Sequence, residues 1–534
     1  MITRIRSGEG RCAFLFFLHA FLLLASYQMV KALREAFMLA KFSAEVRAYS
    51  VALMALVLMF VVPLYSRLRH HVDGARLLRV VTLFFVVTLP LFAVMARNKL
   101  PIAVPFFIWV GIFGVMAVAQ LWAFASDSFN VKSGQRLFVV VMLGANLGAL
   151  AGAKATQLVV TALSPMGLMV LAACTLGATL FLAGPERDAV PEGSRALPSE
   201  QGHPLPRLFG GIGLVLRDRY LLVIALFVVL LNWINSTGEF ILADFVKADA
   251  VAQVAAGGGG DISTHITAFY GDFQFWVTVI SLGIQLLLVS HVYHFIGVRG
   301  ALLVQPIIVA IGYGILAFAP LAGGFIPIFS MIRRIKFAEN GVDYSLMNTT
   351  RQALFLPVDR DSKYDGKTAI DTFFWRFGDL IQAVGVYIGI NLMGWKSHQF
   401  ALLNLGLSLV WIALANVIGR GYARKSQMAV TNNAPEPGDP IPDLLYFPGQ
   451  PIHHPVSPNA FHDPDPGDVL VLRATCADGR PLPHWLRFKV WQQAFVGKAP
   501  LHVEIGELRV TVIASDMDGL RAKSTFVVRR VSVS

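Results

Sequence analysis

Long apolar runs recur along the first 420 residues of this chain. A helix that crosses the hydrocarbon core of a bilayer needs about 20 predominantly apolar residues, and it satisfies its own backbone hydrogen bonds. Segments of this kind lie near residues 12–31, 48–66, 78–96, 101–124, 137–161, 165–183, 220–237, 268–290, 298–318, 323–347, 368–394 and 399–420. The sequence therefore predicts an all-α polytopic membrane protein with about 12 transmembrane helices.

Composition agrees with this fold class and narrows the function. Only 15% of the residues are charged, against about 25% in soluble proteins. The net charge of +12 is explained by cytoplasmic loops rich in Lys and Arg, so no nucleic-acid partner is expected. The three cysteines, Cys12, Cys174 and Cys476, have neither metal-ligand spacing nor an obvious disulfide framework.

The charges of the loops predict the orientation. With the N-terminus inside, the inside segments hold roughly 25 Lys and Arg and the outside segments roughly 8. This asymmetry predicts that both ends of the multi-pass protein are cytoplasmic. The first apolar run is long enough to span and lacks a clean cleavage site, so an uncleaved first helix is expected rather than a signal peptide.

Changes in composition predict the domains. A polar, Pro-rich linker at 184–219 separates a six-helix half at 1–183 from a second half at 220–425. Two such halves around a central cavity are the layout of major-facilitator-type carriers. The prolines of 426–460 predict an extended spacer. Residues 461–534 alternate apolar and polar residues between turn signals, which predicts a small β-sandwich.

The densest charge within the spans lies in the segment 333–383. Charges inside a span are expensive and usually mark a substrate or ion path. Lys363 and Lys367 lie four residues apart, so a helix would present both to a polyphosphate. The positive-inside rule explains the loop cations, but it does not explain Asp371 and Arg376, which lie inside a helix. This segment therefore predicts a carrier of an anionic solute.

Three earlier spans carry further candidate residues. Arg34 ends the first span, where it either meets a substrate phosphate or carboxylate or lies at the membrane interface. Gln120 lies deep in the fourth span. Asn146 lies in the fifth, beside a glycine stripe at 144–152 that predicts close helix packing. Glu239 belongs to the polar run NWINSTGEF of the seventh span, which indicates either a wet interior face or the outer interface.

The predicted β-sandwich holds two pairs of aspartates, Asp463 with Asp465 and Asp516 with Asp518. Alternating carboxylates bind Ca²⁺, but they also stabilise turns, and both interpretations stay open. The chain has no Walker motif and no evident nucleophile–base pair in this tail. It is therefore not predicted to be an enzyme, and no cofactor is expected beyond this calcium.

A resemblance to a known family rests on the segment Lys363-Tyr-Asp-Gly-Lys367-Thr-Ala-Ile-Asp371, followed by Arg376. This segment is similar to the K-Y-x-x-K-x-x-I-D…R signature of the ATP/ADP translocase family, the nucleotide exchange transporters of plastids and intracellular bacteria. The resemblance covers about residues 12–420. It implies a role in nucleotide transport for the charged residues Arg34, Glu239, Lys363 and Lys367.

Other positions extend this resemblance or depart from it. Gly144 and Asn146 resemble the family's motif in the fifth helix, and Arg34 resembles the basic residue at the end of the first. That residue is Lys in the family. The family has Glu-Leu-Trp in the fourth helix where this chain has Gln120-Leu-Trp. The absence of this carboxylate weakens the argument for ATP/ADP exchange specifically. It is less of an objection to transport of another anion.

The tail resembles a cadherin-like, immunoglobulin-type bacterial domain. The matching stretches begin at Phe461, at Gly479 and at Asp516. Such domains usually work outside the cell, whereas the loop charges place this tail in the cytoplasm. The resemblance implies a protein or carbohydrate ligand for the tail.

Two functions of different classes follow from these observations. The first is an integral membrane carrier, an antiporter of nucleotides or a related phosphorylated organic anion, that works by alternating access. The second is a membrane-anchored interaction protein with a degenerate carrier body and a ligand-binding β-sandwich. The expected partners of the carrier are a small nucleotide-like anion and the lipid bilayer.

Overall fold

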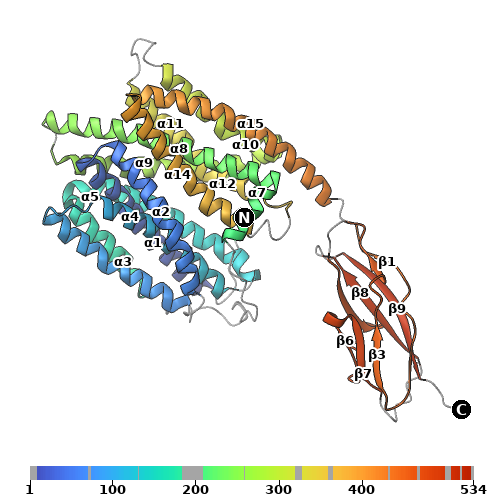
Figure 1. Cartoon of the computed structure of the whole chain (residues 1–534). Coiled ribbons are helices and arrows are strands. Elements are labelled where there is room, and N and C mark those ends of the chain that lie inside the picture. Colours follow the sequence, from blue (N-terminus) through green and yellow to red (C-terminus); the bar gives the residue numbers. More distant parts are fainter. Residues whose placement is uncertain are drawn as a thin grey trace. The chain divides into compact units, whose positions relative to one another are not determined.

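The computed structural model describes residues 9–69, 74–129, 131–182, 208–257, 259–318, 327–358, 365–430, 433–465, 469–499, 507–516 and 520–530. Its internal contacts divide the chain into two units, Met1–Ala423 and Arg424–Ser534. The first unit is helical and the second is made of strands (Figure 1). Each unit is described by itself below.

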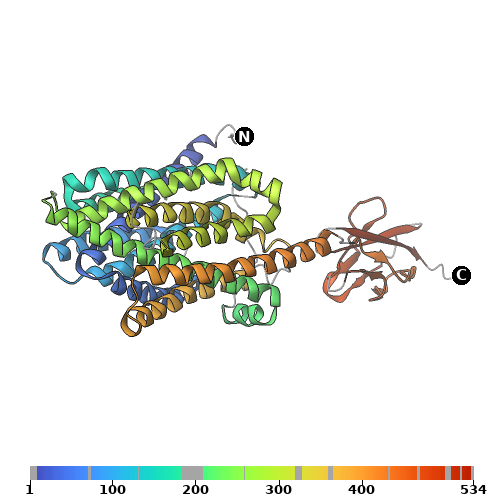
Figure 2. The same cartoon turned by 90° about the horizontal axis from the view of Figure 1, so that it is seen from above.

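The helical unit consists of long helices that run side by side (Figure 1 and Figure 2). The helices are α1 Gly10–Lys41, α2 Ala44–Arg69, α3 Gly74–Arg97, α4 Ala103–Ser128, α5 Val131–Thr179, α7 Leu208–Arg217, α8 Arg219–Ala255, α9 Ile262–Gly283, α10 Val289–Phe318, α11 Ile328–Val342, α12 Asn348–Ala353, α13 Lys367–Ala369, α14 Trp375–Tyr387 and α15 Ser397–Val430. π-helical turns also occur among the described residues, including η2 Ile284–Leu288, η4 Asp343–Met347, η6 Ile370–Phe374 and η7 Ile388–Leu392.

Eight helical stretches among the described residues are long and apolar enough to cross a membrane. Two of them bend sharply, at Ser164 with φ 60° and at Gly297 with φ +63°, so each supplies two rods. The rods 328–353 and 367–392, which contain π turns, complete twelve within the described part of the chain. Each of the twelve predicted spans corresponds to one rod, and the predicted fold class is confirmed.

The glycine stripe brings α5 against α1. A Cβ atom built on Gly148 would lie within 3.0 Å of the carbonyl oxygen of Phe21, and Gly144 and Gly152 meet the α1 backbone in the same way. No side chain can occupy that space, so only glycine allows this approach of two helix backbones. The predicted packing role of the stripe therefore agrees with the structure.

Apolar side chains on the outside of the helical unit indicate a lipid-facing surface. On α3, Val80, Phe84, Val87, Leu91 and Val94 are all more than half exposed and follow one face of the helix. In water, a stripe of this kind would be strongly unfavourable. The spans and this surface together identify a multi-pass membrane protein.

The strand unit is a sandwich of two main sheets around one core. Its strands are β1 Glu436–Pro437, β2 Leu444–Tyr446, β3 Pro451–Pro455, β4 Phe461–His462, β5 Val471–Cys476, β6 Leu486–Lys489, β7 Ala494–Lys498, β8 Leu508–Ser515 and β9 Arg521–Arg530. One sheet has the order β2-β9-β8-β5 and the other β3-β7-β6, with β1 paired to β4. Phe495 and Phe526, from the two sheets, meet in the core at 5.1 Å between ring centroids.

The Pro-rich segment 426–460 is not the extended spacer that the sequence predicts. Its first residues continue α15, and the rest supplies β1, β2 and β3 together with the core side chains Ile441, Leu444 and Ile452. Prolines are tolerated there because β2 and β3 are edge strands, which leave one side of the backbone unpaired. The strand unit thus begins before residue 461.

One partly buried histidine of this unit is expected to make its stability sensitive to pH. Burial lowers the pKa of His454, and a hydrogen bond with the backbone of Pro442 offsets this only in part. Its ring lies against that of Phe526. An unfolded His titrates near pH 6.5. Below that pH the unfolded chain binds a proton more readily than the folded one, so acid favours unfolding.

We therefore expect hydrogen exchange of the β3 and β7 amides in the full chain to accelerate as the pH falls from 7.5 to 5, beyond the intrinsic effect of pH on exchange. The substitution His454→Gln should flatten this dependence. The substitution His453→Gln is the matched control, because His453 is an exposed neighbour on the same strand. An identical pH dependence in both variants would contradict the assignment to His454.

Candidate functional site

A cavity of about 130 Å³ lies where the two helical halves meet. Its lining comes from α1 and α2 of the first half and from α8, α9 and η4 of the second. The lining residues are Lys31, Ala32, Arg34, Glu35, Arg47, Asn235, Glu239, Tyr270, Gln274 and Tyr344. Most of them are charged or polar, which is unusual for the interior of a membrane protein and marks a candidate binding site.

On α1, three charged residues face the cavity because they lie at i, i+3 and i+4 of one helix. They are Lys31, Arg34 and Glu35. Arg34 pairs with Glu35 at 2.5 Å between Nη2 and Oε1, and its guanidinium lies 4.5 Å from the centroid of the Phe107 ring. Glu35 also accepts a hydrogen bond of 2.5 Å from Nε of Arg47 on α2. Two arginines therefore neutralise one buried carboxylate.

Glu239 on α8 joins the two halves electrostatically. Its Oε2 lies 3.8 Å from Nη2 of Arg47, in the first half. Its Oε1 lies 3.3 Å from Nζ of Lys336 on α11 and accepts a hydrogen bond of 3.2 Å from Nδ2 of Asn340. Glu239 thus lies among charged and polar side chains where the two halves meet.

Behind Glu239, the side chain of Lys336 is completely buried. Its Nζ lies 3.1 Å from Oε2 of Glu339 and donates a hydrogen bond of 2.8 Å to Oδ1 of Asn235. Tyr313 on α10 donates to Oε2 of Glu339 at 2.9 Å. A buried charge is tolerated when it is paired and hydrogen-bonded in this way. Three carboxylates and three cations thus form one connected network, the inter-half charge network: Arg34, Glu35, Arg47, Glu239, Lys336 and Glu339.

Of the predicted site residues, Arg34 and Glu239 are brought together at the cavity. Lys367 instead pairs with Asp371 at 2.7 Å, and Arg376 pairs with Asp379 at 3.6 Å, on a rod that does not supply the lining. Arg376 and Asp379 lie three residues apart, so they meet on one face of the helix. Lys363 lies outside the described residues.

Two further predicted residues lie elsewhere in the first half. Gln120 on α4 is only 4% exposed, and both polar atoms of its amide lack a hydrogen-bond partner within the described structure. Asn146 is half-buried on α5. Neither lines the cavity between the halves. A substrate role for either residue stays a prediction.

The sequence interpretation named neither Arg47 nor Lys336 as a site residue. Both are buried in helices. One signal was available: Lys336, Glu339, Asn340 and Asp343 lie at i, i+3, i+4 and i+7, which puts them on one face of a helix. A polar stripe at helical spacing inside an apolar span indicates an interior site.

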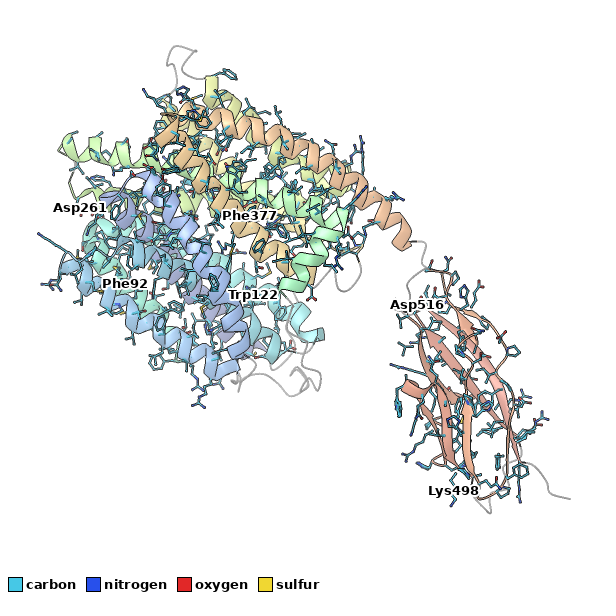
Figure 3. The ribbon with its side chains drawn as sticks, viewed as in Figure 1. Phe92, Trp122, Asp261, Phe377, Lys498 and Asp516 are labelled. Atoms are coloured by element: carbon cyan, nitrogen blue, oxygen red, sulfur yellow. The ribbon has the colours of Figure 1, made fainter. Side chains whose placement is uncertain are left out.

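The aspartates of the strand unit act in turns. Asp463 accepts a hydrogen bond from the backbone of Asp465, and Asp516 accepts one from the backbone of Leu520. Asp516 and Lys498 lie at opposite ends of this unit (Figure 3). Asp518 lies outside the described residues. No group of three or more His, Cys, Asp or Glu side chains suited to a metal occurs in the described part of the chain, and calcium binding stays a prediction.

Comparisons with known proteins confirm the resemblance to the ATP/ADP translocase family. The chain is 22% identical over 362 residues to ADP,ATP carrier protein 1 of Chlamydia pneumoniae, a match of 61% of this chain and 68% of the relative. The ADP,ATP carrier protein 1 of Chlamydia trachomatis serovar D is 23% identical over 352 residues, 58% of this chain and 63% of the relative. The matches span about two thirds of the length of these curated relatives.

Solved structures support the carrier fold. A mutant of the nucleoside transporter NupG superposes with a TM-score of 0.54 at 11% identity, over 78% of this chain and 99% of that chain. The POT family transporter PepTSo superposes with a TM-score of 0.54 at 13% identity, over 78% and 98%. A family described as "Putative Ig domain" matches residues 431–531. The fold is therefore that of a transporter with an immunoglobulin-type domain at its C-terminal end.

Proposed function

We propose that this protein is an antiporter of nucleotides or of a related phosphorylated organic anion, and that it works by alternating access. The observation that supports this most directly is the cavity between the two halves, whose lining includes the cations Lys31, Arg34 and Arg47 of the first half. The similarity to ADP,ATP carrier proteins points to the same class of substrate. The transporter fold provides two halves that can rock around a site between them.

Contacts between the halves fit one state of a rocking cycle. Near the turn between α1 and α2, Lys247 donates a hydrogen bond of 2.7 Å to the backbone oxygen of Phe42. At the same end, Asn391 donates one of 2.6 Å to Glu45. These are the contacts that a second state would exchange for others.

The balance of charge at the cavity favours an anionic substrate. All three carboxylates of the inter-half charge network are already paired with cations, and Lys31 adds one further positive charge. An anion that enters therefore meets a net positive wall, and the low dielectric of the interior strengthens this attraction. A neutral or cationic solute would gain nothing from it.

Lys367 does not line the cavity. The proposal predicts that it is a cation that attracts the substrate before the substrate reaches the cavity. Removal of a charge-assisted hydrogen bond weakens binding by about tenfold or more. We expect Lys367→Ala to lower exchange of labelled ADP, or of another phosphorylated anion, by about that factor in proteoliposomes loaded with unlabelled substrate. Lys489→Ala, an exposed change in the strand unit, is the matched control.

The panel of substrates also separates the two functional classes. Uptake that depends on loaded counter-substrate and falls in Lys367→Ala supports the antiporter. No flux of any nucleotide or organic phosphate by a correctly folded protein would exclude it. The interaction-protein hypothesis would then stand, and its test is a ligand captured by the strand unit in the intact chain.

A further inference from the structure

Lys31 differs from the other cations at the cavity. Arg34, Arg47 and Lys336 each lie within 4.0 Å of a carboxylate. Nζ of Lys31 instead donates a hydrogen bond of 3.2 Å to the neutral Oε1 of Gln274, and no carboxylate of the described residues lies within salt-bridge distance of it. The side chain of Lys31 is partly buried. A cation at a cavity of low dielectric attracts an anion strongly, and within the described structure no carboxylate occupies that position beside Lys31.

Tyr270 supplies an independent observation at the same cavity. Its side chain is 97% buried, since only 3% is exposed, and its hydroxyl lacks a hydrogen-bond partner within the described structure. It lines the cavity one helical turn before Gln274, on the same face of α9. A buried hydroxyl is rarely left without a partner. The missing partner of Tyr270 is an acceptor, and the missing partner of Lys31 is an anion.

We propose that Lys31, Tyr270 and Gln274 form a subsite for a phosphoryl group of the transported anion. One phosphoryl group provides both missing partners: a negative charge for the ammonium of Lys31 and an oxygen that accepts from the hydroxyl of Tyr270. Gln274 holds the ammonium in place through its Oε1. The assignment rests on the proposed function, because it names the site at which that substrate is held.

The size of the cavity supports a group rather than a whole nucleotide. The cavity measures about 130 Å³, whereas pockets that enclose drug-sized ligands measure roughly 300–1,000 Å³. The subsite therefore receives the phosphoryl end of the substrate in this conformation. The ammonium of lysine is a compact point charge, which suits a single phosphoryl oxygen. The neighbouring arginines already use their guanidinium groups to hold Glu35.

The subsite also joins the two halves. Lys31 lies on α1, whereas Tyr270 and Gln274 lie on α9 of the second half. A phosphoryl group is fully coordinated only while these helices are adjacent, and it loses contacts when they separate. A ligand shifts a conformational equilibrium by its difference in affinity for the two states. Occupancy of this subsite would thus favour the conformation described here.

The test uses two substitutions in the full chain that remove one interaction each. Lys31→Gln removes the charge and keeps a polar side chain, and Tyr270→Phe removes a single oxygen. Lys154→Gln is the matched control, because Lys154 also hydrogen-bonds a glutamine, Gln157, at 2.7 Å but lies outside the cavity lining. Binding of ADP and of inorganic phosphate is measured by calorimetry in detergent, alongside exchange in proteoliposomes.

We expect Lys31→Gln to weaken binding of both ligands by about tenfold or more, and Tyr270→Phe to weaken it by about threefold to tenfold. Without ligand, Tyr270→Phe should unfold at the same temperature as the unchanged protein. Lys154→Gln should match the unchanged protein in binding, exchange and unfolding temperature. If the unchanged protein exchanges ADP and both variants bind it equally well, the subsite is wrong and the antiporter stands. If the protein binds phosphate through Lys31 but exchanges nothing, the subsite stands and the proposed transport is wrong.

Discussion

The substitution Gly148→Ala is expected to prevent most of the protein from reaching a folded, monodisperse state. The added Cβ would overlap the backbone oxygen of Phe21 on α1. Because that neighbour is backbone, no side chain can turn aside, and the two helices must separate. Overpacking of this kind costs about 3 kcal/mol or occasionally more, and close packing of small residues is the main attraction between helices in a bilayer.

Gly406→Ala on α15 is the control, since an added Cβ there meets nothing within 4 Å. The measurement is the monodisperse fraction in mild detergent, followed by thermal unfolding of what remains. We expect a marked loss for Gly148→Ala and little change for Gly406→Ala. Equal stability of the two variants would show that α1 and α5 are not in close backbone contact.

The features that the sequence predicted well are periodic or local. Apolar runs of spanning length predict all twelve rods, because a membrane imposes the same length and composition on every helix that crosses it. The spacing of Gly144, Gly148 and Gly152 predicts a close helix contact, because small residues on one face let two backbones approach. Neither inference requires knowledge of which helix lies beside which.

The charge network could not be predicted in full because the two pairs that connect its parts, Arg47 with Glu239 and Lys336 with Glu239, join helices that are far apart in the sequence. Glu239 was identified from its own polar surroundings, but its partners Arg47 and Lys336 come from helices on either side of it in the chain. The segment that holds Lys336 is rich in Lys and Arg, for which the positive-inside rule gives an ordinary explanation. That explanation concealed Lys336, whose side chain is fully buried.

A similar reason applies to the prolines of 426–460. Proline favours an extended backbone both in a linker and in an edge strand, so composition alone does not separate the two. The decisive feature is the pairing of β2 with β9 and of β3 with β7, which joins the segment to strands much later in the chain. The sequence pattern of 461–534 predicted the sandwich because its strands alternate clearly.

The substitution Lys336→Met is also expected to cause a large loss of stability. The substitution keeps the length of the side chain but leaves Glu339, which is 1% exposed, without its cation. Glu239 retains Arg47 at 3.8 Å, so Glu339 bears most of the effect. Breaking a buried ion pair by removing one partner costs about 3–5 kcal/mol, because the remaining charge is uncompensated.

A second substitution tests that cause. Glu339→Gln in the Lys336→Met background removes the unpaired charge and preserves an acceptor for the hydroxyl of Tyr313. We expect the double variant to recover most of the unfolding temperature lost by the single one, a coupling that independent sites would not show. If the double variant is as unstable as Lys336→Met, packing rather than charge explains the loss. A recovered double variant also allows exchange to be measured on a folded protein, so the contribution of Lys336 to transport is separated from its contribution to folding.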